Sequence, residues 1–203
     1  LSAQENRSEQ LESENERLAT EAITDPLTQL PNRRAFEQTL DREIAARIRR
    51  PEPTSLGLLM MDHDKFKTVN DTHGHLAGSQ VLKEFGYLLK QTVTVPGATL
   101  ARYGGDEFVI ILPDHSVGDA LAVAESVHAA LRRTTFLQGS FSWAEGPIYW
   151  REPLTMSVGV AVYPIHLARK GTVDLKKNLL LRAADQAMYE AKAAGKDRVQ
   201  VAR

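Results

Sequence analysis

The feature that most constrains the fold is a pair of short strand-like runs separated by only four residues. The runs are Thr99 to Tyr103 and Phe108 to Leu112, and the tetrapeptide GGDE at 104–107 lies between them. Both runs have the length and composition of strands, and the two glycines supply the backbone angles that a tight bend requires. The sequence therefore predicts an antiparallel β-hairpin with an acidic pair at its turn.

The other apolar residues divide the chain into helical and strand-like segments around this hairpin. Helical spacing predicts helices at about 32–50, 75–93, 117–133 and 175–194, and short apolar runs predict strands at 55–61, 155–163 and 199–201. The core order is strand, helix, strand, strand, helix, strand, followed by a further helix and strand. This order predicts an α+β fold with a ferredoxin-like central sheet that contains antiparallel strands and is flanked by helices.

Residues 1–24 differ in composition from the rest of the chain. They are rich in Glu, Gln, Ser and Asn, and their apolar positions are Leu11, Leu18 and Ala22, the first two being one heptad apart. This spacing indicates an N-terminal helix, either a coiled-coil-like signalling helix that enters from an upstream domain or a solvated overhang with partial helicity. We expect the chain to be a fragment of a longer protein, with one further domain at 25–203.

The overall composition argues against several classes of function. A chain of 203 residues suits one domain with a short appendage, and its net charge of −1 gives no bulk attraction to nucleic acid or to an anionic membrane. The chain contains no cysteine, which excludes disulfides, thiolate metal sites and a cysteine nucleophile. No apolar run is long enough to span a bilayer, and the polar start is unlike a signal peptide. We therefore expect a cytoplasmic segment without membrane or nucleic-acid contacts.

Two acidic clusters lie at the ends of predicted strands. Asp62-His63-Asp64 follows the first strand, and Asp106-Glu107 lies in the hairpin turn. Either cluster alone would be ordinary for a strand end or a turn. The ferredoxin-like order makes the first strand and the hairpin neighbours, so together they indicate a site of hard oxygen ligands of the kind that Mg²⁺ prefers. Magnesium there could bridge phosphate oxygens and lower the pKa of an attacking hydroxyl.

Several separated motifs then make the sequence recognisable. They are DHDKFKTVNDTHGHLAG at 62–78 and RYGGDEF at 102–108, supported by DPLT at 25–28, LPNRR at 30–34, SVG at 157–159 and ADQAMYEAK at 184–192. In this order they resemble the GGDEF family of bacterial diguanylate cyclases, from about residue 25 to the C-terminus. The resemblance implies a nucleotidyl-cyclase-like version of the ferredoxin-like fold.

The resemblance implies a magnesium-dependent centre, with Mn²⁺ as an alternative metal. Asp62 and Asp106 would ligate the metal, assisted by the backbone carbonyl of His63, and Glu107 would complete the acidic cluster. Asp106, Glu107 and Lys67 would form the catalytic group.

The resemblance also implies a phosphate-binding set. The backbone N–H groups of Lys65 and Phe66 and the side chain of Lys67 would hold the β- and γ-phosphates, and Lys192 would reach them from the last predicted helix. Lys196 stands where the family usually has arginine. Lysine keeps the charge but lacks the bidentate fork, so we expect a looser hold on phosphate.

Two residues are expected to contact the purine. Asn70 would hydrogen-bond the base edge, and Ser79 stands where the family usually has an aspartate that accepts hydrogen bonds from guanine. A carboxylate rejects the ring-nitrogen acceptor of adenine, whereas a serine hydroxyl both donates and accepts. The chain thus resembles the hybrid subgroup that makes 3′,3′-cyclic GMP-AMP beside cyclic di-GMP. The alternative is neutral drift, with Asn70 alone still selecting guanine.

The activity implied by the resemblance joins two purine nucleoside triphosphates, GTP with GTP or with ATP, into a cyclic dinucleotide and releases pyrophosphate. Each protomer of a homodimer would hold one nucleotide, so an upstream sensor domain could control activity through the N-terminal helix. A strict diguanylate cyclase is one alternative. A non-catalytic nucleotide-binding module that signals by dimerising is another, although the acids and Lys67 are all present.

Overall fold

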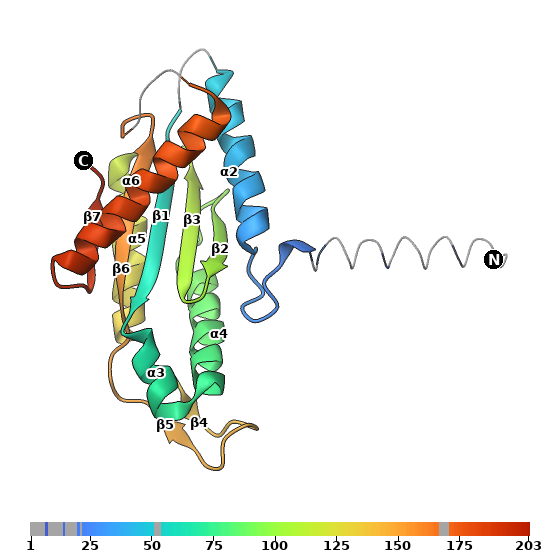
Figure 1. The fold of residues 1–203 in the computed structure, drawn as a ribbon, viewed down its shortest axis with the longest axis vertical. Coiled ribbons are helices and arrows are strands. Elements are labelled where there is room, and N and C mark those ends of the chain that lie inside the picture. Colours follow the sequence, from blue (N-terminus) through green and yellow to red (C-terminus); the bar gives the residue numbers. More distant parts are fainter. Residues whose placement is uncertain (1–6, 8–13, 15–19, 21, 51–53, 167–170) are drawn as a thin grey trace.

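The computed structural model describes residues 7, 14, 20, 22–50, 54–166 and 171–203, and its centre is a five-stranded mixed sheet (Figure 1). In chain order the elements are α2 (Arg33–Ile48), β1 (Leu56–Asp64), α3 (Phe66–His73), α4 (His75–Thr92), β2 (Thr99–Gly104), β3 (Glu107–Pro113), α5 (Val117–Arg133), β4 (Gln138–Gly139), β5 (Ile148–Tyr149), β6 (Thr155–Tyr163), α6 (Val173–Ala193) and β7 (Arg198–Val201). None of the helices in these ranges is long and apolar enough to cross a bilayer.

The sheet confirms the predicted α+β architecture. Its strand order is β2-β3-β1-β6-β7, with β1 antiparallel to both β3 and β6, and with β7 added parallel to β6. The predicted hairpin is β2–β3. At the N-terminus, Ala22 and Ile23 are helical. Leu11 and Leu18 lie outside the described residues, so the heptad stays a prediction.

Side chains alternate along β1 between two hydrophobic cores. Leu58 and Met60 pack in the core under α2 and α6, whereas Leu59 and Met61 pack in the core under α4 and α5. Both faces are covered, which is why β1 has a continuous apolar sequence instead of a polar–apolar alternation. Figure 1 shows α6 crossing one face of the sheet and α5 lying behind it. The alternation decides where the polar residues after Met61 point.

The segment after β1 differs from the prediction. The sequence predicted no helix between the strand at 55–61 and the helix at 75–93, but the chain forms the helix α3, which begins directly after Lys65 in a left-handed conformation with φ of 57°. Gly74, with φ of 83°, then separates α3 from α4. Helical spacing is hard to recognise here because α3 has only eight residues and buries only Val69.

Gly159 in β6 sets how closely α6 packs on the sheet. A Cβ at this position would overlap the carbonyl oxygen of Ala184 and the backbone nitrogen of Met188. Because both obstacles are backbone atoms of a packed helix, neither can move without shifting α6.

We expect Gly159→Ala to lower the free energy of unfolding by at least about 2 kcal/mol through overpacking. The matched control is Gly118→Ala in α5, where the nearest heavy atom to a new Cβ is 3.8 Å away. That control should be neutral or stabilising by about 0.5–1 kcal/mol. Urea unfolding of both variants checks the prediction, and equal midpoints would contradict it.

Candidate functional site

The carboxyl end of β1 and the β2–β3 turn lie side by side, as the strand order required. The β1–β3 pairing ends at Asp62 opposite Glu107, and Asp106 precedes Glu107 in the turn. Burial raises the pKa of Asp62, and the neighbouring Asp106 and Asp64 raise it further. Burial likewise raises the pKa of Glu107, with Asp62 and Asp106 adding to the effect. The site therefore concentrates negative charge where solvent only partly screens it.

Lys192 of α6 supplies the positive charge nearest to this cluster in the described residues. Its Nζ lies 3.0 Å from Oδ2 of Asp62. This single lysine lies against three carboxylates, and the pKa of Asp62 stays raised despite it, mainly because of burial and further because of Asp106 and Asp64. This arrangement fits a bound cation, which would remove the remaining repulsion.

The donor set suits a cation that keeps water or phosphate ligands. Among the described residues, no group of three His, Asp or Glu side chains is arranged to hold a metal ion. Mg²⁺ is usually bound through only one or two carboxylates, with water and substrate phosphates completing its shell. Asp62 and Asp106 can supply that number, and their role as ligands stays a prediction.

The third predicted position, His63, points to the other side of the sheet. Its imidazole is buried, and Nδ1 lies 3.1 Å from the backbone carbonyl oxygen of Asp106. Burial lowers the pKa of His63. Only the backbone carbonyl of His63 is therefore left for the predicted metal role.

Asp64 is used differently from Asp62, although the two acids share a face of β1. Its carboxylate accepts hydrogen bonds from the hydroxyls of Thr155 and Ser157, at 2.9 and 2.8 Å, and from the N–H of Asp197 at 2.9 Å. These three donors hold β6 and the start of β7 against β1. Asp64, which the sequence had grouped with the metal-binding acids, is a structural anchor.

The predicted phosphate-binding residues lie around the start of α3 and the end of α6. Among the described residues no side chain caps α3, so the N-terminal N–H groups at Phe66 and Lys67 are available to an anion. Lys65 and Lys196 line one pocket of about 600 Å³. Lys67 is exposed and lines none of the pockets described here. The structure thus brings Lys65 and Lys196 together at one pocket, and the role of Lys67 stays a prediction.

The predicted purine contacts share a second pocket with Asp106. This pocket, of about 340 Å³, is lined by Asn70, Ser79, Asp106 and Arg102, among others. A base bound between Asn70 and Ser79 would therefore lie beside the acidic turn.

Gly78 is a residue whose role in this pocket the sequence analysis missed. A Cβ at Gly78 would overlap Oδ1 of Asn70 and press on the ring of Phe66. Only glycine lets the Asn70 side chain lie against α4. The available signal was a buried glycine inside a helical pattern, a position where glycine usually has a packing reason.

Arg102 is a second missed residue, and it fixes the acidic turn. Its Nε and Nη2 donate to the carbonyl oxygen of Gly105 at 3.0 and 2.7 Å, and its Nη1 donates to Asp25 at 3.0 Å. Burial alone would raise the pKa of Asp25, but hydrogen bonds from Thr28 and Arg102 outweigh it and lower the pKa. Asp25 and Arg102 are separated by 77 positions in the sequence, which left no sequence signal for this pair.

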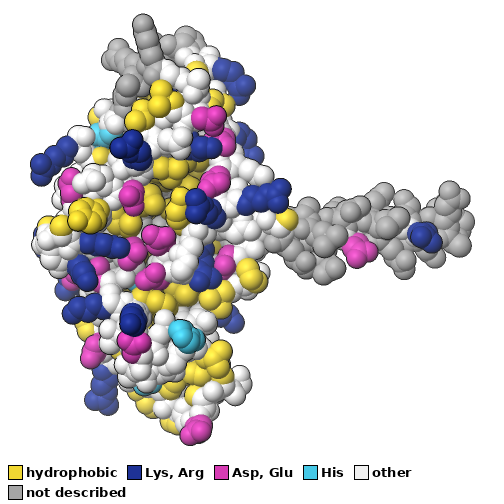
Figure 2. Space-filling view, in the orientation of Figure 1, with side chains coloured by type: hydrophobic (Ala, Val, Ile, Leu, Met, Phe, Trp, Pro, Cys, Tyr) yellow, Lys and Arg dark blue, Asp and Glu magenta, His cyan; other side chains and the backbone are white. Residues whose placement is uncertain are grey.

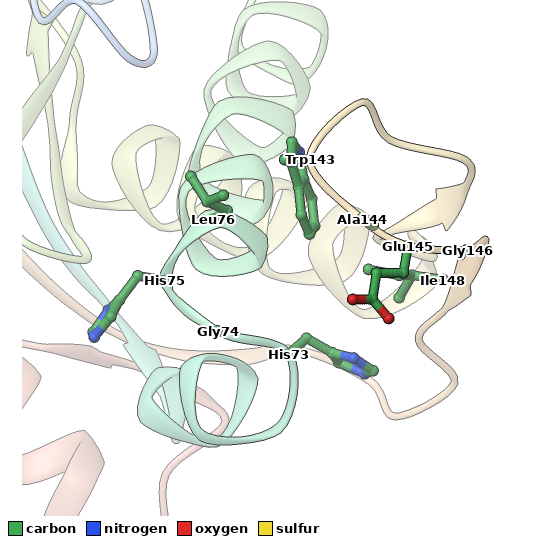
Figure 3. Close-up of a pocket in the computed structure, with 9 residues that line it drawn as sticks. All are labelled: His73, Gly74, His75, Leu76, Trp143, Ala144, Glu145, Gly146 and Ile148. Carbon is green, nitrogen blue, oxygen red and sulfur yellow. The ribbon is translucent and has the colours of Figure 1, made fainter.

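A third pocket lies next to the one lined by Asn70 and Ser79, where the β4–β5 hairpin approaches the junction of α3 and α4 (Figure 3). His75 lines both pockets. Figure 3 shows the Glu145 carboxylate pointing toward His73, with Trp143 and Leu76 on the opposite side and His75 turned away.

Figure 2 shows Lys and Arg interspersed with Asp and Glu on the face that α6 crosses.

Comparison with known proteins identifies the family of this arrangement. The model of the GGDEF diguanylate cyclase domain matches residues 22–198. The chain is 37% identical over 184 residues to the diguanylate cyclase DgcP of Pseudomonas aeruginosa and 38% identical over 179 residues to the response regulator PleD of Caulobacter vibrioides. These matches cover 89% and 88% of the chain but only 24% and 36% of the two relatives.

Solved structures agree with this assignment over nearly the whole chain. The coiled coil and GGDEF domain of DgcB from Caulobacter crescentus, solved with c-di-GMP, superposes with a TM-score of 0.82 at 28% identity, covering 98% of this chain and 95% of that one. The GGDEF domain of TpbB (YfiN) from Pseudomonas aeruginosa gives a TM-score of 0.72 at 31% identity, covering 89% and 94%. The chain therefore belongs to the GGDEF family of diguanylate cyclase domains.

Proposed function

We propose that this chain condenses two purine nucleoside triphosphates into a cyclic dinucleotide and releases pyrophosphate. The observation that carries the proposal is that one cavity is lined by Asn70 and Ser79, the expected purine contacts, and by Asp106 of the acidic turn. DgcP, which is similar over 89% of the chain, is a diguanylate cyclase. Cyclic di-GMP is therefore the first expected product.

The charge and position of each residue suggest which part of the substrate it would bind. Asn70 and Ser79 would hold the base, and the N–H groups at the start of α3 would hold the terminal phosphates. Asp62 and Asp106 would hold Mg²⁺, which supplies charge neutralisation at the phosphates when bound. Lys192, which is paired with Asp62 at 3.0 Å, would lie within reach of the same phosphates.

The part of the chain that the structure describes holds one such site. Joining two nucleotides requires two of them, so the reaction needs two protomers whose sites face each other. The 3′-hydroxyl of each nucleotide would attack the α-phosphate of the other, forming a P–O bond as the bond to pyrophosphate breaks. We propose that an upstream domain controls this pairing through residues 1–24.

Ser79 supports a finer proposal about the purine. It lines the purine pocket beside Asn70. A serine at this position imposes no penalty on the acceptor nitrogen of adenine, since its hydroxyl can donate as well as accept. We therefore propose that ATP is accepted beside GTP and that 3′,3′-cyclic GMP-AMP forms in addition to cyclic di-GMP.

The first test of the activity is Asp106→Asn, which keeps the shape of the side chain and removes its charge. We expect turnover of GTP to fall by at least about 100-fold, as for loss of a group that stabilises transition-state charge. The control is Asp71→Asn on the exposed face of α3, which should retain activity. Product formation followed by mass spectrometry measures both, and a fully active Asp106→Asn would refute the site.

The purine proposal is tested with Ser79→Asp and an equal mixture of ATP and GTP. The new carboxylate should reduce the share of mixed product by at least about tenfold. It would place a carboxylate oxygen opposite the ring nitrogen of adenine, and both atoms can only accept a hydrogen bond. Ser79→Ala adds no acceptor and should keep the mixed product. An unchanged product ratio in Ser79→Asp would remove Ser79 from the argument, and cyclic di-GMP alone from the wild type would indicate a strict diguanylate cyclase.

Gly78→Ala tests the placement of Asn70. The new methyl group should displace the Asn70 side chain and weaken binding of a non-hydrolysable GTP analogue by at least about tenfold, through loss of its hydrogen bonds. Calorimetric titration measures the affinity, with Gly118→Ala as a control for the added methyl group. Unchanged affinity in Gly78→Ala would show that Asn70 does not contact the base.

A further inference from the structure

The buried side chain of His63 holds the acidic turn from the inside of the molecule. The β1–β6 pairing runs on to Asp64 opposite Thr155, but the β1–β3 pairing stops at Asp62 opposite Glu107. Beyond that pair, the carbonyl of Asp106 has no partner in the β1–β3 ladder. The imidazole Nδ1 of His63 lies 3.1 Å from this carbonyl oxygen.

The direction of this hydrogen bond follows from its partners. A carbonyl oxygen can only accept, so Nδ1 of His63 carries the proton and donates. The other ring nitrogen, Nε2, is buried and has no hydrogen-bond partner among the described residues. The imidazole is therefore present at the cost of a buried unsatisfied atom, which an apolar side chain of similar size would avoid. Packing alone gives no reason for a histidine here.

Three aromatic rings hold the imidazole in this orientation. The ring centroids of Phe85 and Phe108 lie 4.4 and 5.8 Å from that of His63, both edge-on, and the centroid of Phe66 lies 5.9 Å away. Phe66 is the first residue of α3. The His63 ring thus touches the start of the proposed phosphate-binding helix and the acidic turn at the same time.

Two consecutive carbonyls of the turn are held in this way. Arg102 binds the carbonyl oxygen of Gly105, and His63 binds that of Asp106. Fixing both carbonyls fixes the two peptide planes, and with them the direction in which the Asp106 side chain leaves the backbone.

We propose that the His63 side chain is a positioning residue for the cyclase reaction, which it serves by orienting Asp106 through the Asp106 carbonyl. The expected effect of His63 on turnover rests on the proposed function, whereas its expected effect on the conformation of the turn does not. The His63 ring itself contacts neither substrate nor metal in this role.

Three variants separate the hydrogen bond from the packing. His63→Leu keeps an apolar side chain of similar size and removes the donor. His63→Asn places an amide nitrogen near the position of Nδ1, whereas His63→Gln places it near that of Nε2. If the bond to Asp106 matters, the Asn variant should behave like the wild type, and the Leu and Gln variants should not.

The first readout is amide hydrogen exchange of the segment 102–108, which needs no activity. We expect exchange there to be at least about tenfold faster in His63→Leu and His63→Gln, corresponding to the loss of one hydrogen bond, and near wild type in His63→Asn. The second readout is dinucleotide formation. Here kcat should fall about tenfold in the Leu and Gln variants with an unchanged KM for GTP, because Asn70 and Ser79 are untouched.

Two results would overturn the proposal. One is unchanged exchange and unchanged kcat in His63→Leu. The other is a His63→Asn variant as impaired as His63→Leu, which would mean that the ring acts only by packing. If the wild type formed no dinucleotide at all, the proposed function would fail, while the exchange data would still decide whether His63 holds the turn.

Discussion

The whole site depends on the alternation of side chains at the carboxyl end of β1. Asp62 follows Met60 onto the α6 face, where it meets Lys192, and His63 follows Met61 into the core beside Phe85. A shift of one residue in register would bury the carboxylate and expose the imidazole. The apolar residues before Asp62 therefore determine which side of the sheet carries the negative charge.

The sequence predicted the parts of the site that follow from strand order. An apolar run ending at Asp62 and a hairpin turning at Asp106 had to meet once both strands joined one sheet, and the structure pairs Asp62 with Glu107. The helices and strands that the sequence predicted were confirmed, because periodicity reports burial directly, but the short helix α3 was not predicted. The predicted helix at 117–133 agrees with α5, whose Ser116 cap and Asp119 form a capping box.

The missed features depend on contacts that periodicity does not report. Asp62 and Asp64 have the same side chain and lie on the same face of β1. Only the Asp64 carboxylate accepts hydrogen bonds from Thr155 and Ser157, which are about 90 residues away in the sequence. Arg102 and Asp25 are likewise far apart in the sequence and meet only in the folded chain. Such pairs are fixed by the completed fold, and a single sequence gives no sign of which acid will be satisfied internally and which will stay free for a ligand.

The two acids differ because of what surrounds each of them. Asp64 receives three hydrogen bonds from neutral donors within the fold. Asp62 is paired with Lys192, yet its pKa stays raised, mainly because of its burial and further because of the charges of Asp106 and Asp64. An unbalanced charge at a partly buried position destabilises the fold unless a ligand compensates it, and such perturbed groups mark functional sites. The structure therefore distinguishes the anchoring acid from the one that we propose as a ligand of a cation.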